Sequence, residues 1–363
     1  MKEQTGPNDR TGCCLPPSVQ RSRSHTEDDA DSLCNHRKMG GGKIGVTVGK
    51  FNPPHLGHQH LVTAAAERVD ELHVLLCDRP DQSLSATDRA AWLRDAVPAN
   101  VVIHVTPDDL PEENEPWAAR TLDVLPSRPD VAFTSEAYGE GWAEMMGAQH
   151  ELIDLNRNAF PISATTIRMD AGANFGWLVP AARADLARRV VVAGAESTGK
   201  STVAEAMARE MQTAWAPEHG RWYWEGRRYR ADQRWTTDEF EAIARSQESL
   251  INDLARLSTN GVVIADTDAL VTCVWHERYV GKPLLDVVEP VVPDIYLVCA
   301  PDFDWVQDGT RESAEMRQWM HERTLELVER SGAPYAVLEG PADERLARAL
   351  QLVDPLTRFP ELI

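Results

Sequence analysis

The sequence predicts an α/β protein made of two doubly wound domains, each a parallel sheet covered by helices on both faces. Three observations predict this fold class. Apolar runs of strand length alternate with segments of helical spacing along most of the chain, and parallel strands need such long crossovers between them. The second half opens with a glycine-rich loop between a strand and a helix. The third observation is the length, because 363 residues are too many for one ordinary domain.

The first 42 residues belong to neither predicted domain. They mix Pro, Ser, Thr, Arg and Asp, show almost no apolar periodicity and end in three consecutive glycines. A segment of this composition cannot bury enough apolar surface to fold, so residues 1–42 are predicted to form a disordered tail. They also lack the length and pattern of a helix-turn-helix domain.

The first predicted domain spans residues 43–180. At Lys43 the composition changes abruptly, and a buried strand is followed by an amphipathic helix. The same alternation then repeats. The expected strands are 44–48, 72–77, 101–105 and 131–134, and the expected helices are 58–69, 88–95 and 117–125.

The second predicted domain spans residues 188–355. A stretch containing a proline, 179–183, interrupts the pattern, and a short helix at 182–188 leads into the next strand. Strands and helices then alternate again. The expected strands are 190–193, 261–265, 295–299 and 335–338, and the expected helices are 202–211 and 312–331.

Charge and composition narrow the class of protein. The formal net charge of −20 argues against a general nucleic-acid or anionic-membrane binder, although a pocket for a phosphorylated metabolite needs only a few cations. The six cysteines form no C-x-x-C pair, so neither a disulfide framework nor a zinc site is expected. No apolar stretch approaches the ~20 residues of a membrane span, and no signal-peptide core is present. A cytoplasmic protein is expected.

The most specific motif is the segment 194–201, a complete G-x-x-x-x-G-K-[ST] loop. In such loops the backbone N–H groups and the start of the following helix hold phosphate oxygens. Lys200 is expected to reach the β- and γ-phosphates, and Ser201 to ligate Mg²⁺. This half is therefore predicted to bind ATP or GTP. The residues expected at the nucleotide are Gly194, Glu196, Ser197, Thr198, Gly199, Lys200, Ser201 and Thr202.

Two carboxylates follow the strand at 261–265. One of Asp266 and Asp268 is expected to order Mg²⁺, with Asp266 the metal candidate beside Ser201, and the other to accept a proton from a substrate hydroxyl. Alternatively, both acids simply cap the next helix.

Two further polar segments belong to this half. Residues 305–311 have the composition of a mobile lid, from which Arg311 could reach the transferring phosphate. Glu218 and Arg221 form a polar cluster that could bind the ribose or phosphate of a substrate. A solvated turn is the alternative for this cluster.

In the first half, the segment 49–58 joins the first strand to the first helix and contains an H-x-G-H pattern. Gly57 lets phosphate approach the backbone, and His55, His58 and Lys50 suit the stabilisation of a transferring phosphoryl or nucleotidyl group. Zinc binding is a weaker alternative, because no cysteine or acid lies nearby. Helix-start histidines bonded only to backbone are the structural alternative.

A second motif of the first half is I-S-x-T-x-x-R at 162–168, which opens a short helix. Ser163 and Thr165 could hold phosphates, and Arg168 could clamp them. The pair of motifs resembles the nucleotidyltransferase superfamily of HxGH adenylyltransferases. That resemblance implies in-line attack of a substrate phosphate on the α-phosphorus of MgATP. It also places Gly49 and Phe51 in the ATP-binding set.

The sequence leaves the roles of several other residues of this half undecided. The segment 133–139 resembles a family element that lines the nucleotide pocket, but an ordinary strand end is equally expected. Trp117 could stack on an aromatic base of the substrate, although packing is the usual role of a tryptophan. The roles of Arg89 and Trp92 are undecided.

The order of the two domains resembles the NadR-type bifunctional NMN adenylyltransferase/ribosylnicotinamide kinases, from about Lys43 to about Val353. The resemblance implies phosphorylation of nicotinamide riboside to NMN by the second domain and formation of NAD by the first, with ATP and Mg²⁺. The implied partners are these small molecules, with a homo-oligomer possible. Since the helix-turn-helix of some members is missing, no nucleic-acid binding is carried over.

Two other functions stay open at this point. A fused kinase and adenylyltransferase for another vitamin, such as riboflavin, would differ only in the base pocket. A nucleotide-sensing regulator without turnover is disfavoured by the intact Lys200, His55, His58 and Asp266. A mechanical ATPase is also disfavoured, because no arginine-finger arrangement follows the phosphate loop.

Overall fold

The computed structural model describes residues 42–136, 139–282, 290–302 and 314–359. The predicted tail, apart from Gly42, and the predicted lid at 305–311 with Arg311 lie outside these ranges. Among the helices within them, none is both long and apolar enough to cross a bilayer.

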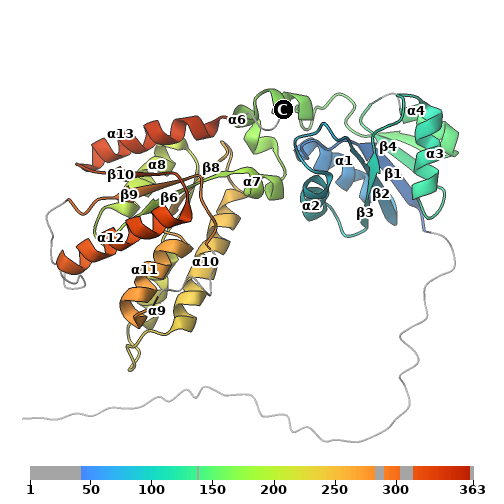
Figure 1. Ribbon diagram of the computed structural model, residues 1–363. Coiled ribbons are helices and arrows are strands. Elements are labelled where there is room, and N and C mark those ends of the chain that lie inside the picture. Colours follow the sequence, from blue (N-terminus) through green and yellow to red (C-terminus); the bar gives the residue numbers. More distant parts are fainter. Residues whose placement is uncertain (1–41, 137–138, 283–289, 303–313, 360–363) are drawn as a thin grey trace, which may run out of the picture. The chain divides into compact units, whose positions relative to one another are not determined.

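The first sheet has five parallel strands in the order β3-β2-β1-β4-β5 (Figure 1). The chain starts in the centre, moves outward through β2 and β3, and returns to the other side of β1. The strand order therefore reverses between β1 and β4, where open α/β sheets bind their ligands. The strands are β1 (Ile44–Gly49), β2 (Glu71–Asp78), β3 (Val101–Pro107), β4 (Val131–Thr134) and β5 (Gln149–Leu152).

Helices cover both faces of this sheet. Alternate residues of β2 point to opposite sides: Leu72, Val74 and Leu76 pack with α1 and α2, whereas Leu75 packs with α3 and α4. The sheet is therefore doubly wound, as predicted. The helices are α1 (Leu56–Ala66), α2 (Ala86–Ala96), α3 (Asn114–Val124) and α4 (Gly139–Met146).

A run of short helices connects the two sheets. It holds the loop after β1, because His55 pairs with Leu178 in an isolated antiparallel bridge and the Val179 amide donates to the Pro54 carbonyl at 3.3 Å. The elements are α5 (Ala164–Met169), α6 (Ala171–Asn174), η1 (Phe175–Trp177) and α7 (Pro180–Leu186). The domain limits at 180 and 188 stay a prediction.

The second sheet is also parallel and five-stranded, in the order β10-β9-β6-β8-β7. Val190 and Val192 of its central strand face α8 and α13, while Val191 and Ala193 face α10, α11 and α12. The strands are β6 (Arg188–Ala193), β7 (Ala214–Ala216), β8 (Val262–Asp266), β9 (Ile295–Cys299) and β10 (Tyr335–Leu338). The helices are α8 (Lys200–Met211), α9 (His219–Arg227), α10 (Thr237–Ala255), α11 (Ala269–Val280), α12 (Ala314–Ser331) and α13 (Ala342–Val353), with a final turn η2 (Asp354–Thr357).

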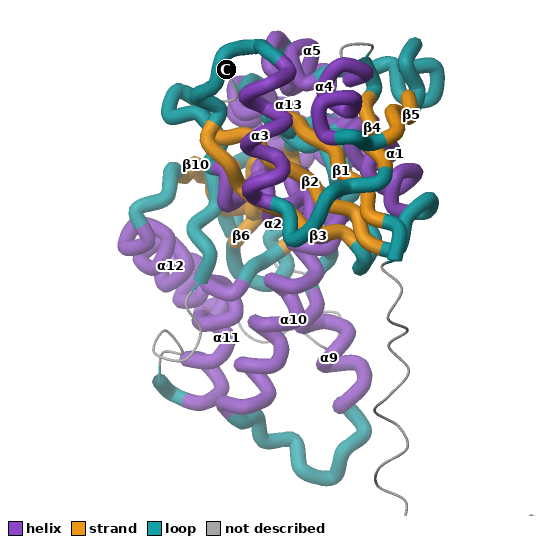
Figure 2. Tube along the Cα trace, turned by 90° about the vertical axis from the view of Figure 1, so that its right-hand side faces the viewer, coloured by secondary structure: helices purple, strands orange, loops and turns teal. Residues whose placement is uncertain are grey.

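All eight predicted strands are present, and β5 and β7 are additions that the sequence analysis did not predict. The helices that were also not predicted are α4, α6, α9, α10, α11 and α13. Figure 2 shows α10 and α11 lying alongside each other, and both contribute to the same apolar core.

Candidate active sites

The first candidate site lies where β1 gives way to α1. His55 is the N-cap of α1, and its Nδ1 atom accepts from the amides of Gly57 at 3.1 Å and His58 at 3.4 Å. An accepting Nδ1 carries no proton, so in the neutral ring the proton lies on Nε2. The H-x-G-H spacing thus sets the tautomer of its own first histidine.

His58 stacks on His55, with ring centroids 3.7 Å apart and an interplanar angle of 24°. Phe51 meets His58 edge-on at 4.8 Å between ring centroids. Burial, with the charge of Arg157 added, lowers the pKa of His55 to about 4. Burial also lowers the pKa of His58 well below its usual value. Both rings are therefore uncharged hydrogen-bond donors at neutral pH.

Gly57 lies close against the first histidine. A Cβ atom at this position would be 3.0 Å from His55 Cε1 and 3.1 Å from His55 Nδ1. A larger residue would thus push the ring that caps the helix.

A cavity of about 190 Å³ opens beside these histidines. Ser163 caps α5 by accepting from the Thr166 amide at 3.1 Å, and this cap turns the start of α5 toward the cavity. The structure thus brings together predicted residues about a hundred positions apart. Predicted residues lining the cavity are His55, Gly57, His58, Ser163 and Thr165, and residues not singled out include Asp154 and Arg157. Ser135, from the segment 133–139, also lines it, whereas residues 137–138 of that segment lie outside the described ranges.

A second cavity of about 270 Å³ contains the predicted cations Lys50 and Arg168. Lys50 is ion-paired with Asp108 at 3.4 Å, and Arg168 donates to the Asn52 carbonyl at 2.6 Å. Arg79 and Asp81, which the sequence analysis did not single out, also line this cavity.

Some expected residues have a packing role. Phe51 is 1% exposed and belongs to the core under β1, so it positions His58 and does not face a cavity. Gly49 lies against the Phe51 ring. Trp117 packs on the core of α3 and α4 and lines neither cavity.

Two undecided residues are now explained. The buried Arg89 donates to the carbonyls of Lys50, Cys77 and Leu84 and to the side chains of Asp78 and Gln82. It therefore holds the walls of the second cavity. Trp92 donates to the Asp185 carboxylate at 2.5 Å.

The second candidate site is the phosphate loop between β6 and α8. Gly194 has φ 135°, and a Cβ there would come within 2.8 Å of the Cys299 carbonyl oxygen, so only glycine fits. Gly199 has φ 81° and caps α8. Lys200 is 7% exposed and its Nζ donates to the Ala195 carbonyl at 2.8 Å across the loop.

Ser201 and Asp266 meet beneath the loop. The Ser201 hydroxyl donates to Asp266 Oδ2 at 2.5 Å. Asp266 is 1% exposed, and its Oδ1 atom has no hydrogen-bond partner within the described part of the chain. A buried carboxylate oxygen beside a hydroxyl is the donor set that Mg²⁺ prefers, with phosphate and water completing the shell. The residues therefore fit the ion.

Asp268 does not share this site. Its Oδ1 atom accepts from the Val271 amide at 2.9 Å and caps α11, and its Oδ2 atom accepts from the Tyr296 hydroxyl at 2.5 Å. Burial raises its pKa to about 7. Asp268 thus caps the next helix, which is the alternative given for this acid, and its catalytic role stays a prediction.

Glu218 lies at the same site, directly after β7. Burial raises its pKa, while the charges acting on it are those of Lys200, Asp266, Arg221 and Glu196. Arg221 is exposed on α9, and Thr202 is exposed in the first turn of α8. Within the described ranges, no group of three or more His, Cys, Asp or Glu side chains could hold a metal ion by itself.

Comparison with known proteins agrees with this division. A family described as cytidylyltransferase-like matches residues 46–170, and a family described as an AAA domain matches residues 189–345. The "Trifunctional NAD biosynthesis/regulator protein NadR" of Escherichia coli (strain K12) is 27% identical over 338 residues, which are 85% of this chain and 82% of that protein. Its counterpart from Salmonella typhimurium is 26% identical over the same shares.

Solved structures show the same fold. A crystal structure of NadR protein in complex with NR superposes with a TM-score of 0.65 at 23% identity, covering 88% of this chain and 97% of that one. A second, in complex with NAD and AMP-PNP, gives 0.60 at 22% identity, covering 86% and 96%.

The fold and the two sites define a class of enzyme, in which a nucleotidyltransferase is joined to a P-loop kinase. The order of the two halves and the length of the match narrow this class. Over 85% of its length the chain is similar to the NadR proteins of two bacteria.

Proposed function

We propose that the second half phosphorylates nicotinamide riboside to NMN and that the first half joins NMN to the AMP part of ATP, giving NAD and pyrophosphate. The observation that carries the proposal is that both sites are intact in one chain that matches NadR relatives over 85% of its length. Those relatives are named for NAD biosynthesis, and the similar structures hold NR or NAD with AMP-PNP.

In the adenylyl transfer, a phosphate oxygen of NMN attacks the α-phosphorus of ATP. The bond from that phosphorus to the bridging oxygen breaks, and pyrophosphate leaves. His55 and His58 donate hydrogen bonds to the triphosphate from beside the first cavity, with Ser163 and Thr165. Lys50 and Arg168 supply positive charge from the second. No enzyme nucleophile is needed, so positioning and charge stabilisation account for catalysis.

In the kinase step, the 5′-hydroxyl oxygen of the riboside attacks the γ-phosphorus, and ADP leaves. Lys200 and the amides of the loop hold the phosphates. Glu218 takes the hydroxyl proton in place of Asp268. Its position among Lys200, Asp266 and Arg221 suits a general base, and burial raises its pKa above that of an ordinary glutamate.

Ser201 and Asp266 would hold Mg²⁺ in this half, since one oxygen of Asp266 is buried without a partner within the described residues. The ion neutralises charge on the triphosphate when bound. The protein's own part is to keep both oxygens fixed at the edge of the loop.

The decisive experiment supplies purified protein with MgATP and nicotinamide riboside and follows NMN and NAD by chromatography. NMN followed by NAD is the expected result. NAD from supplied NMN, with no product from the riboside, would contradict the kinase substrate. If neither product forms, the nicotinamide assignment fails, and riboflavin is the next substrate to test.

Three further expectations accompany the proposal. The chain is cytoplasmic, it binds no nucleic acid through residues 1–42, and it can form a homo-oligomer. Each stays a prediction.

A further inference from the structure

A charged contact inside the phosphate loop plays no part in the mechanism described above. Arg278 Nη1 lies 3.7 Å from Glu196 Oε2, and the Arg278 side chain is only 3% exposed. Glu196 is the third residue of the loop, and Arg278 lies in the last turn of α11. Asp268, two residues after Asp266, caps the start of the same helix. Thus β8 and α11 bring both an acid and an arginine to the loop.

Aromatic rings hold the Arg278 side chain in place. Its guanidinium carbon lies 4.9 Å from the centre of the Trp275 ring and 5.0 Å from that of Tyr279. Nη1 also contacts the sulfur of Met320 at 3.1 Å. Cation–π attraction acts on the face of a guanidinium, whereas carboxylates and phosphates bind its edge. This packing can therefore keep the group oriented while its anionic partner changes.

The charge beside Arg278 changes when a nucleotide binds. In the proposed function the loop carries the triphosphate, so we expect its γ-phosphate near the carboxylate of Glu196, where the two anions would repel each other. A phosphate offers a guanidinium paired, charge-assisted hydrogen bonds, which are among the strongest in proteins. Exchange of the Glu196 carboxylate for a phosphate is thus expected when ATP binds.

We propose that Arg278 is a catalytic residue of the kinase half, which Glu196 holds in the empty site and which binds the γ-phosphoryl group during its transfer. This inference rests on the proposed kinase function. In the transfer, the bond between the γ-phosphorus and the bridging oxygen breaks as the bond to the riboside oxygen forms. The hydroxyl proton leaves to Glu218. Arg278 offsets the charge on the equatorial oxygens of the phosphoryl group.

The test compares Arg278→Ala and Arg278→Lys with the wild-type chain. For Arg278→Ala, we expect the kcat of riboside phosphorylation to fall about 1,000-fold, as for other arginines that act on transferred phosphoryl groups. The Kd for ATP should rise by a much smaller factor, because Arg278 contacts the γ-phosphate in the ATP complex but offsets more charge in the transition state. Added guanidinium ion should restore part of the kcat of Arg278→Ala. Arg278→Lys should recover less than the added ion does, since lysine lacks the planar fork.

The urea midpoint of each variant is the control for folding of the kinase half. Adenylyl transfer from supplied NMN, which the same chain carries on another sheet, is the control for the amount of intact protein. A structural brace between Glu196 and Arg278 is the competing explanation. Glu196→Gln removes the ion pair but keeps the arginine, so our proposal predicts a smaller loss of kcat for this variant than for Arg278→Ala, and no rescue of that loss by guanidinium ion. Equal losses in Glu196→Gln and Arg278→Ala, with no rescue by guanidinium, would overturn the proposal. So would an Arg278→Ala kcat close to that of the wild type. Phosphorylation of the riboside by the wild-type chain tests the proposed kinase function separately. Failure of that function can therefore be told apart from failure of the role proposed for Arg278.

Discussion

At the residue scale, the first site depends on two buried imidazoles that are uncharged at neutral pH. His55 is fixed by its cap of the helix start, and His58 by stacking on His55 and by the edge-on contact with Phe51. A neutral, oriented donor costs no reorganisation when charge develops on the substrate.

The proposal that His58 acts in adenylyl transfer predicts the effect of His58→Ala. Loss of one such donor is expected to lower the kcat of NAD formation by roughly 100-fold or more. Riboside phosphorylation should stay within experimental error of the wild type. Both rates come from the same chromatographic assay, and an unchanged rate of NAD formation would contradict the first-site assignment.

Asp268 gives the fold a pH dependence. Its pKa is about 7 in the folded chain against an ordinary 3.8, because burial beside Tyr296 disfavours the carboxylate. Between these values, the folded state keeps a proton that the unfolded state has released. Stability should therefore be fully present below about pH 4 and fall as pH rises to about 7, by at most about 1.4 kcal/mol per pH unit.

The variant Asp268→Asn tests this dependence. Asparagine keeps an oxygen for the Val271 amide but does not titrate, so it should remove this contribution. The measurement is the urea midpoint of wild type and variant from pH 5 to pH 8. Parallel curves for the two proteins would show that Asp268 is not the titrating group.

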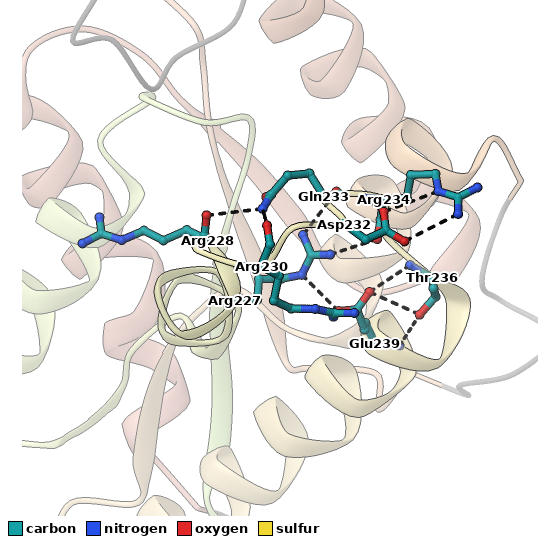
Figure 3. Close-up of polar contacts among 8 residues, drawn as sticks. All are labelled: Arg227, Arg228, Arg230, Asp232, Gln233, Arg234, Thr236 and Glu239. Carbon is teal, nitrogen blue, oxygen red and sulfur yellow. Dashed lines mark hydrogen bonds and ion pairs between the residues drawn. The ribbon is translucent and has the colours of Figure 1, made fainter.

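At the element scale, the contact between α9 and α10 organises one side of the second site. Figure 3 shows Arg227 at its centre: Nε donates to Glu239 Oε1 at 3.0 Å, and Nη2 donates to the Arg234 carbonyl at 2.9 Å. Glu239 completes a capping box with Thr236 at the start of α10. The Arg227 guanidinium also covers the Trp235 ring at 4.0 Å. Since α9 begins directly after Glu218, this contact steadies the proposed base.

Arg227→Met is expected to lower the free energy of unfolding by roughly 3 kcal/mol, because it removes one partner of a buried ion pair. Arg230→Met is the matched control. Arg230 also contacts Glu239, but its side chain is 55% exposed, so its loss should cost less than about 1 kcal/mol. Urea denaturation followed by far-UV circular dichroism measures both, and equal effects would refute the burial argument.

The strands that were predicted and those that were not differ in composition and length. The predicted strands, including the edge strands β3 and β10, are largely apolar runs of four residues or more, which periodicity identifies directly. In contrast, β7 (Ala214–Ala216) has three residues, and β5 (Gln149–Leu152) is mostly polar. These two segments become strands through pairing with a neighbouring strand, and not through an apolar pattern of their own. Because β5 was not predicted, Arg157 in the loop after it could not be placed at the first cavity.

At the scale of the whole molecule, each half has its own candidate phosphate site on its own parallel sheet. The product of the proposed kinase reaction is the substrate of the proposed adenylyl transfer. Because both reactions can be assayed on one chain, the activity of the unaltered half serves as an internal control for each variant.

Lys200→Ala is the corresponding prediction for the second half. Removing the buried ammonium from the loop should lower riboside phosphorylation by at least about 100-fold, since it is expected to reach the β- and γ-phosphates. NAD formation from supplied NMN should be unaffected. Loss of both activities would contradict independent sites.

The sequence by itself determined the class of fold, the order of the two halves and the two phosphate-binding motifs. These features are local, because the periodicity of apolar residues and the spacing of residues within a loop can both be recognised in one contiguous segment. Tertiary structure decided which side chains share a site. Asp266 and Asp268 are indistinguishable in sequence, yet one meets Ser201 and the other turns to Tyr296. Arg278 reaches Glu196 only because α11 packs beside the loop. Such choices depend on long-range packing, which no short segment encodes.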